Sequence, residues 1–201
     1  QKYASLFGLN ERTGIEIEEA APQIANEFPV MAAIGQSNNN YTTVQLARYV
    51  TAVANEGTVY QYTLLNRLED SDGNVLQTFE PQVRNQIDVL DTEEWNAIHS
   101  GMRMVVENTK EFDGFPIEAA GKTGTAQQNL KRPNHALFVG YAPYDDPEIS
   151  IATRIAYGYT SHNAAKLARN VFAYYFNVEN EDELLNGQAA NGNSSSNEIS
   201  D

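Results

Sequence analysis

Apolar side chains recur at helical spacing in three stretches of the chain. The first stretch follows Thr42, and Gln45 three positions later completes a capping-box pattern. The second follows Asp91, with Glu94 in the equivalent position. The third follows the polar residues 161–163. We expect three helices, and their buried faces are predicted to contain Val44, Ala47, Val50 and Val53 in the first, Trp95, Ile98, Met102 and Val105 in the second, and Ala164, Leu167, Ala168, Val171, Phe172 and Tyr175 in the third.

Strand-like segments alternate with these helices. Residues 58–68 and 74–81 have β-like composition, and the turn sequence at 70–73, Asp-Ser-Asp-Gly, is typical of a hairpin between them. Short connections favour antiparallel pairing, and the last helix is expected to cover one face of the sheet. The pattern predicts an α/β chain of the α+β type, an antiparallel sheet flanked by helices, with further strands at 117–127, 135–142 and 148–157 and a turn at 143–147.

Composition divides the chain into a domain and a tail. A chain of 201 residues with 41% hydrophobic content can form one domain with a substantial core. From Asn177 onward the chain has no Lys or Arg and is rich in Asn, Ser, Gly and acidic residues. We therefore expect a domain over 1–176 and an acidic, polar, flexible tail over 177–201. The chain starts with Gln1 and no signal-peptide pattern, so we expect it to be part of a longer protein.

The charge and the residue counts exclude several classes of function. A net charge of -14 would repel nucleic acids and anionic lipids. Zero cysteines exclude a disulfide scaffold, a thiol nucleophile and a cysteine zinc site. His99, His135 and His162 share no metal-ligand spacing, so we expect no metal or cofactor and favour structural or surface roles for all three. A place at the rim of a cleft is the alternative for His135.

A lysine between glycine and threonine, at Gly121, Lys122 and Thr123, is the first candidate for chemistry. It is not a phosphate-binding P-loop, because the required earlier glycine is replaced by Pro116. In a strand, Lys122 would share a face with Gly124, while Thr123 would share the other face with Thr125. A cation, two hydroxyls and a bare glycine suit a peptide substrate that ends in a carboxylate. The alternative is an edge-strand lysine that only discourages aggregation.

The segment from Lys122 to Gln127, Lys-Thr-Gly-Thr-Ala-Gln, is followed by the strand sequence NHALFVGYAP. Together they resemble the third active-site motif of the class B penicillin-binding proteins. The upstream blocks FGLNERTGIEI and AIGQSNNNYTTVQLARYVTAVANEGTVY resemble the part of that family between its second and third motifs. The resemblance spans about residues 3–176 and favours the elongation branch, similar to penicillin-binding protein 2, over the division branch. It implies the C-terminal part of a penicillin-binding transpeptidase, or serine β-lactamase-like, fold.

The resemblance also implies a reaction and a set of site residues. A serine of an S-x-x-K motif would attack the penultimate D-alanine carbonyl of a peptidoglycan stem peptide, and β-lactam antibiotics would be attacked in the same way. Lys122 would hold the second motif's serine and the substrate carboxylate, which Thr123 and Thr125 would also bind. The backbone N–H of Thr125 would form half of the oxyanion hole. Gly124 would let the substrate lie along the strand edge.

The chain departs from the family pattern at the nucleophile. No S-x-x-K occurs in it. S-x-N occurs at residues 37–39 and 161–163, but we expect the first in a loop and the second at a helix start. For Gln36 and residues 38–40 we favour a hydrogen-bonded turn over substrate contact.

We therefore expect the nucleophile and the second motif on a missing N-terminal part of the same domain, and this chain alone to be inactive. The resemblance implies that the parent protein is anchored in the cell membrane, with the domain outside the cytoplasm. The alternatives are a non-catalytic penicillin sensor or scaffold of the same fold and, third, a serine β-lactamase.

Overall fold

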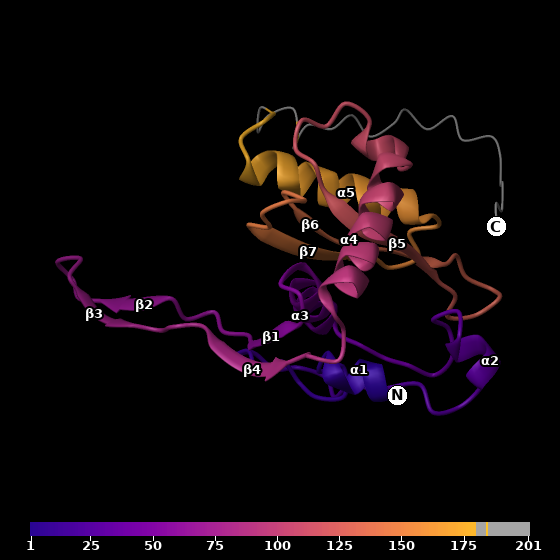
Figure 1. Cartoon of the computed structure of the whole chain (residues 1–201), viewed down its shortest axis with the longest axis horizontal. Helices are drawn as coiled ribbons and strands as arrows, with labels where there is room; N and C mark the ends of the chain where they lie inside the picture. The colour runs from indigo at the N-terminus through magenta and orange to yellow at the C-terminus, as the bar shows by residue number, and fades with distance from the viewer. Residues whose placement is uncertain (180–183, 185–201) are drawn as a thin grey trace.

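The computed structural model describes residues 1–179 and 184 (Figure 1). Most of the expected tail, residues 180–183 and 185–201, lies outside this described part. None of the helices in the described part is long and apolar enough to cross a membrane. The elements in chain order are α1 Lys2–Leu6, α2 Pro29–Ala32, α3 Thr43–Ala54, β1 Thr58–Gln61, β2 Arg67–Glu69, β3 Val75–Thr78, β4 Gln82–Gln86, α4 Thr92–Glu107, the 3₁₀ turn η1 Lys110–Phe112, β5 Ala120–Ala126, β6 His135–Ala142, β7 Ile149–Ile155 and α5 Ser161–Tyr175.

A three-stranded antiparallel sheet in the order β5-β6-β7 forms the centre of the molecule, as the strand patterns predict. Strand β6 has the predicted bounds, whereas β5 and β7 are each shorter than the predicted segments at 117–127 and 148–157. Gly121 pairs with Gly140, and Lys122 pairs with Val139. Strand β5 lies at the edge of this sheet, so one of its sides is paired with β6 and the other is open.

Helices cover both faces of the sheet (Figure 1). Helix α5 covers one face, where Phe138 is fully buried against its alanines and stacks on Phe112 at 5.7 Å between ring centroids. Helices α3 and α4 pack on the opposite side, where Val50, Ala120 and Tyr141 form a second core with Met102 at its margin. The expected helix over one face of the sheet is confirmed, and the opposite face is covered as well.

Both predicted capping boxes are present. The Thr42 hydroxyl accepts from the N–H of Gln45, whose side chain accepts from the N–H of Thr42 at 2.8 Å. Asp91 and Glu94 make the same reciprocal pair at the start of α4. Each box satisfies two backbone donors that the helix leaves unpaired, which fixes where the helix begins.

The predicted buried faces are only partly right. Val50, Val53, Trp95, Ala164, Ala168 and Phe172 are buried, but Ile98 is 36% exposed and Leu167 45% exposed. Val171 and Tyr175 are exposed as well. The prediction was wrong at the three α5 positions because this helix approaches the sheet through small alanines, including Ala165 and Ala173, which leaves the larger residues on the flank of the helix.

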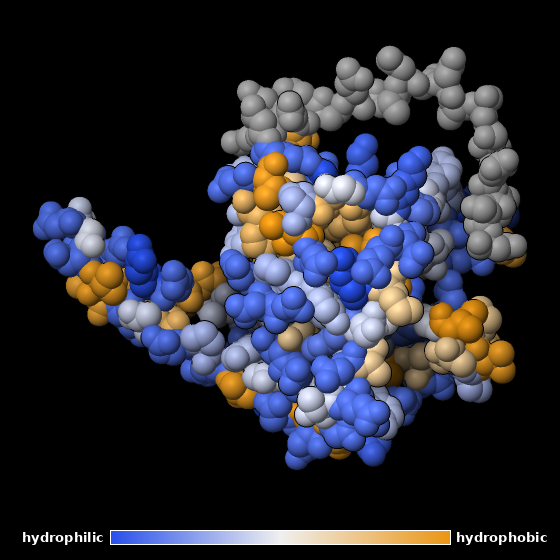
Figure 2. Space-filling model, turned by 45° about the horizontal axis from the view of Figure 1, so that its top comes forward, coloured by the Kyte–Doolittle hydropathy of each residue, from blue (hydrophilic) through white to orange (hydrophobic). Residues whose placement is uncertain are grey.

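A β-arm projects from one side of the molecule (Figure 1 and Figure 2). The hairpin predicted around residues 70–73 is confirmed, because β2 and β3 pair antiparallel and Asp70 accepts from the N–H groups of Asp72 and Asn74. The predicted single run at 58–68 is instead two strands. Strand β1 pairs with β4, which the pattern did not predict, while the hairpin continues outward.

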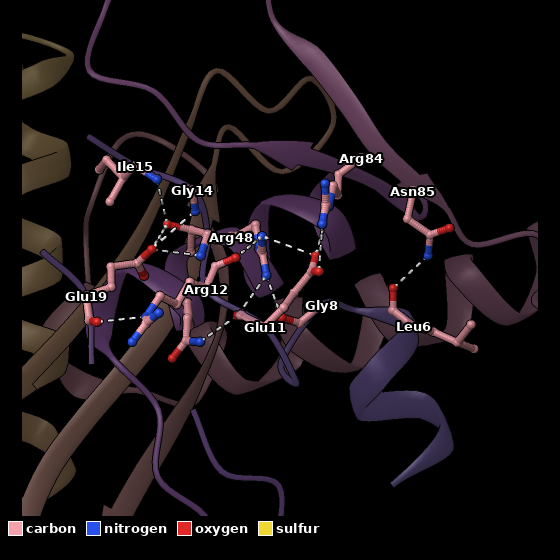
Figure 3. A network of polar contacts seen from close by, with 12 residues as sticks. Leu6, Gly8, Glu11, Arg12, Gly14, Ile15, Glu19, Arg48, Arg84 and Asn85 are labelled. Atoms are coloured by element: carbon pink, nitrogen blue, oxygen red, sulfur yellow. Dashed lines mark hydrogen bonds and ion pairs between the residues drawn. The ribbon is translucent and has the colours of Figure 1, made fainter. Parts of the chain in front are cut away.

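Arg48 of α3 ties the N-terminal segment to the rest of the fold (Figure 3). Its side chain is 1% exposed and donates to the carbonyls of Gly8, Glu11 and Arg12. Burial lowers the pKa of this guanidinium, while the Glu11 carboxylate at 3.8 Å opposes that shift. Glu11 also forms a bidentate pair with Arg84 of β4. One side chain in α3 therefore fixes a segment about forty residues away in the sequence.

Candidate active site on the edge strand

The strand β5 carries all four predicted site residues, and its position depends on a close contact with β6. Gly121 and Gly140 face each other across the two strands, and the Phe138 ring fills the space beside both. A Cβ on Gly121 would overlap this ring and would lie 2.8 Å from the carbonyl of Val139. Glycine at these two positions therefore allows the aromatic core to reach directly beneath the motif.

The four residues alternate between the two faces as the strand pattern predicts. Lys122 and Gly124 pair with Val139 and Leu137, on the face that α3 and α4 partly cover. Thr123 and Thr125 belong to the opposite face, where Thr123 pairs with Phe138 of the α5 core. The motif thus offers a cation on one face, hydroxyls on the other, and backbone groups along the open edge between them.

Lys122 and Thr125 are both exposed at this edge. The Lys122 ammonium donates to the carbonyl of Thr123 at 2.8 Å and makes no ion pair with any carboxylate in the described part of the chain. In a chain with twice as many acidic as basic residues, this leaves an uncompensated positive charge at the motif. Such a charge, with hydroxyls and free N–H groups nearby, is suited to binding a carboxylate.

Two hollows in the surface lie away from this strand. One, of about 340 Å³, is lined by Lys110, Lys166 and Arg169 among others. The second, of about 260 Å³, lies between the end of α4 and the segment before β5. Neither hollow is lined by residues of the motif strand, so the motif forms one side of a site. A substrate bound there would be enclosed only if another surface faced the strand.

The three histidines have structural or surface contacts. His99 contacts the Val53 carbonyl at 2.8 Å and lies 6.3 Å from the Trp95 ring. His162 is exposed and lies 2.9 Å from a Glu111 oxygen. His135 is only 8% exposed, which fits the structural role expected for it, and its place at a cleft rim stays a prediction. Within the described residues, no three His, Asp or Glu side chains gather closely enough to hold a metal ion.

His135 is buried because both of its ring nitrogens have neighbours. Nδ1 accepts from the N–H of Tyr157 at 3.0 Å, and Nε2 lies 3.3 Å from the Arg154 guanidinium. Burial lowers the pKa of the His135 ring, and the Arg154 charge lowers it further. The sequence patterns did not predict a role for Tyr157. In the structure it is a non-glycine residue with a positive φ of 54°. Such a conformation is uncommon and indicates a locally fixed backbone.

The polar loop at 36–40 is a hydrogen-bonded turn, as expected. Asn39 donates to the carbonyls of Gly35 and Gln36, both at 3.1 Å. Ser37, at a φ of 101°, donates to the Glu27 carbonyl. The S-x-N sequence at 161–163 begins at Ser161, the first residue of α5, so the expected loop and helix start are both confirmed.

Comparisons with known proteins agree with this geometry. The family model described as "Penicillin binding protein transpeptidase domain" matches residues 1–173. Penicillin-binding protein 2A of Bacillus subtilis is 27% identical over 95% of this chain, which spans 30% of that relative. The peptidoglycan D,D-transpeptidase MrdA of Haemophilus influenzae is 32% identical over 85% of this chain, which spans 31% of it. The chain thus spans about a third of the length of these curated relatives.

Solved structures show the same fold. Penicillin-binding protein 2B of Streptococcus pneumoniae superposes with a TM-score of 0.77 at 24% identity, covering 89% of this chain and 32% of that one. Penicillin-binding protein 2 of Pseudomonas aeruginosa superposes with a TM-score of 0.72 at 25% identity, covering 87% and 42%. The expected fold and the resemblance to the penicillin-binding protein 2 type are both confirmed. This chain therefore belongs to the transpeptidase domain family of the penicillin-binding proteins.

Proposed function

We propose that this chain forms the substrate-binding wall of a peptidoglycan D,D-transpeptidase, an acyltransferase that cross-links stem peptides in the cell wall. The observation that carries this proposal is the Lys122 to Thr125 segment on the open edge of β5, with Lys122 and Thr125 exposed, in a chain of this family. We place the nucleophilic serine outside these residues because the chain has no S-x-x-K, and the second motif as well because the S-x-N sequences at 37–39 and 161–163 lie in a loop and at a helix start. We use "parent transpeptidase" for the longer protein that would join this chain to that serine.

Each motif residue has a proposed role. The Lys122 ammonium attracts the C-terminal carboxylate of the peptide and orients the second-motif serine. The hydroxyls of Thr123 and Thr125 donate to the same carboxylate. The Thr125 N–H donates to the carbonyl oxygen as negative charge develops on it during attack by the serine, which is worth about 3 kcal/mol in comparable oxyanion holes. Gly124 has no side chain to obstruct a peptide that lies along the edge.

β-Lactam antibiotics would react at the same place. The solved relatives include penicillin-binding protein A of Mycobacterium tuberculosis as an imipenem acyl-enzyme, of the same fold with a TM-score of 0.76. A β-lactam carries a carboxylate near a strained amide, so Lys122 and the two threonines would orient it as they orient the peptide. We also propose that the parent transpeptidase is anchored in the cell membrane and exposes this domain outside the cytoplasm, where its cell-wall substrate lies.

Labelling with a fluorescent penicillin tests this function. The parent transpeptidase should be labelled at a serine outside residues 1–201, and the 201-residue chain alone should not be labelled. Lys122→Ala should slow labelling about a hundredfold, because a positioned charge at the acyl-transfer site is lost. Lys166→Ala, at an exposed lysine of α5, serves as the matched control and should leave the rate unchanged.

The labelling results also separate the alternatives. Labelling of the isolated chain at one of its own serines would contradict the proposed division of the site. A parent protein that is labelled but never releases D-alanine from peptides would be a penicillin sensor or scaffold. Rapid hydrolysis of the penicillin instead of stable labelling would make it a β-lactamase.

A further inference from the structure

The proposed roles on β5 define the direction in which a bound peptide extends away from the reacting bond, and the inference rests on that proposed function. The terminal carboxylate lies toward Lys122 and Thr123, within reach of the Thr125 hydroxyl, and the reacting carbonyl lies beside the Thr125 N–H. Because these positions follow one another along the strand, the upstream residues of the substrate extend past Thr125. They therefore approach the loop at 127–134 that joins β5 to β6.

This loop is basic in a strongly acidic chain. No Asp or Glu occurs between Glu118 and Asp145, whereas Lys131 and Arg132 lie within the loop. Arg132 is exposed, and in the described part of the chain it makes no ion pair with a carboxylate. Several other arginines of this chain, such as Arg84 and Arg103, do pair with carboxylates.

Arg132 is nevertheless held in a defined place. Its Nη1 donates to the Tyr157 hydroxyl at 2.6 Å, and its guanidinium carbon lies 5.2 Å from the centre of the Tyr157 ring. The Tyr157 hydroxyl in turn donates to Gln128 at 3.0 Å, which fastens the beginning of the same loop. These contacts use one N–H of the guanidinium and leave the others available to a ligand.

Tyr157 is fixed from beneath by His135. The two ring centroids are 4.8 Å apart, and the Tyr157 N–H donates to His135 Nδ1. Arg154 contacts the other ring nitrogen of His135. Leu137 of β6 pairs with Gly124 on one side and with Arg154 on the other. The Arg154 side chain therefore lies on the same face of the sheet as Lys122. The exposed Arg154 therefore contacts His135 directly, and the exposed Arg132 is joined to His135 through the Tyr157 ring.

We propose that Arg132, with Arg154 as a second cation, binds a second carboxylate of the peptide substrate, located upstream of the D-alanyl-D-alanine end. A guanidinium matches a carboxylate through two parallel N–H donors, and the stack on Tyr157 and His135 fixes its position before the substrate arrives. The site thus distinguishes a stem peptide with a free upstream carboxylate from one in which that group is amidated.

The test uses the parent transpeptidase and two synthetic peptides that end in D-alanyl-D-alanine. One peptide has a free carboxylate upstream of the scissile bond, and in the other this carboxylate is amidated. Release of D-alanine should give a kcat/KM about tenfold higher for the free carboxylate. Arg132→Gln should remove this preference mainly through KM, and Tyr157→Phe should reduce it, while the rate of penicillin labelling stays at the wild-type value.

Matched measurements make the outcomes distinct. Lys166→Gln, which removes an exposed cation from α5, should keep the preference. Equal kcat/KM for the two peptides in a wild-type protein that penicillin labels would overturn the inference and leave the proposed function standing. If Arg132→Gln slowed penicillin and both peptides alike, Arg132 would only maintain the fold, which also overturns the inference. A wild-type protein that penicillin does not label would overturn the proposed function, and the inference with it.

Discussion

Gly121 and Phe138 share one space between β5 and β6, because the Phe138 ring lies where a side chain of residue 121 would project. The ring is fully buried and the backbone carbonyl of Val139 closes the same space, so neither neighbour can move aside freely. The contact places the core of the domain directly beneath the strand that carries Lys122.

Gly121→Ala should therefore destabilise the parent transpeptidase by about 1–3 kcal/mol, the usual cost of overpacking a core. The measurement is the midpoint of thermal unfolding by circular dichroism, which does not depend on how well either variant binds penicillin. Gly124→Ala is the matched control for stability, since the nearest atom to its added methyl group would be the Leu137 Cβ at 3.4 Å. Equal melting temperatures for the two variants would contradict the packing argument.

Arg48→Met should be strongly destabilising, by about 3–5 kcal/mol. The substitution leaves the carbonyls of Gly8 and Glu11 without their donor and removes the buried partner of the Glu11 carboxylate. Arg67→Met removes an exposed arginine paired with Glu69 and should cost less than about 1 kcal/mol. Thermal unfolding of both variants provides the comparison. Similar decreases in the free energy of unfolding would contradict the expectation that the buried Arg48 contributes more than the exposed Arg67.

The stability should decrease in mild acid because of His135. Its pKa is lowered in the folded state from the ordinary value of 6.5, so the unfolded chain binds the proton more readily. The contribution of His135 to the free energy of unfolding is fully present well above pH 6.5. It is lost as the pH falls from 6.5 through the lower pKa of the folded state. Protonation also abolishes the Nδ1 acceptor that receives the Tyr157 N–H.

Melting temperatures at about pH 8 and about pH 5.5 measure this effect. His135→Asn supplies an acceptor that does not titrate, so this variant should lose less stability on acidification than the wild type. His162→Asn changes an exposed histidine and should keep the wild-type acid sensitivity. An unchanged pH profile in His135→Asn would show that other groups cause the acid response.

Thr125→Val should separate the hydroxyl from the backbone of the same residue. The variant keeps the N–H proposed for the oxyanion hole and loses only the donor to the substrate carboxylate. Penicillin labelling should slow about tenfold, the loss expected for one hydrogen bond to a charged group. Thr78→Val, at an exposed threonine of the β3 strand in the projecting arm, is the control. A wild-type labelling rate in Thr125→Val would remove the hydroxyl from the proposed mechanism.

Local patterns predicted the elements better than the faces they bury. The capping pairs at Thr42 and Asp91 fixed two helix starts, because each depends only on residues three positions apart. The burial of Arg48 could not be predicted in this way, since its partners lie at Gly8, Glu11 and Arg12. The same holds for β4, whose pairing with β1 joins segments separated by the whole projecting hairpin.

The sequence by itself determined the family, the motif from Lys122 to Thr125 and the alternation of its side chains, because short motifs and strand periodicity are local properties. Only the tertiary structure placed β5 at an open sheet edge, buried His135, and stacked Arg132 on Tyr157. These features depend on which distant segments pack together, and packing is decided by the whole core. The proposed carboxylate site belongs to this second group, since its residues come from two loops and two strands.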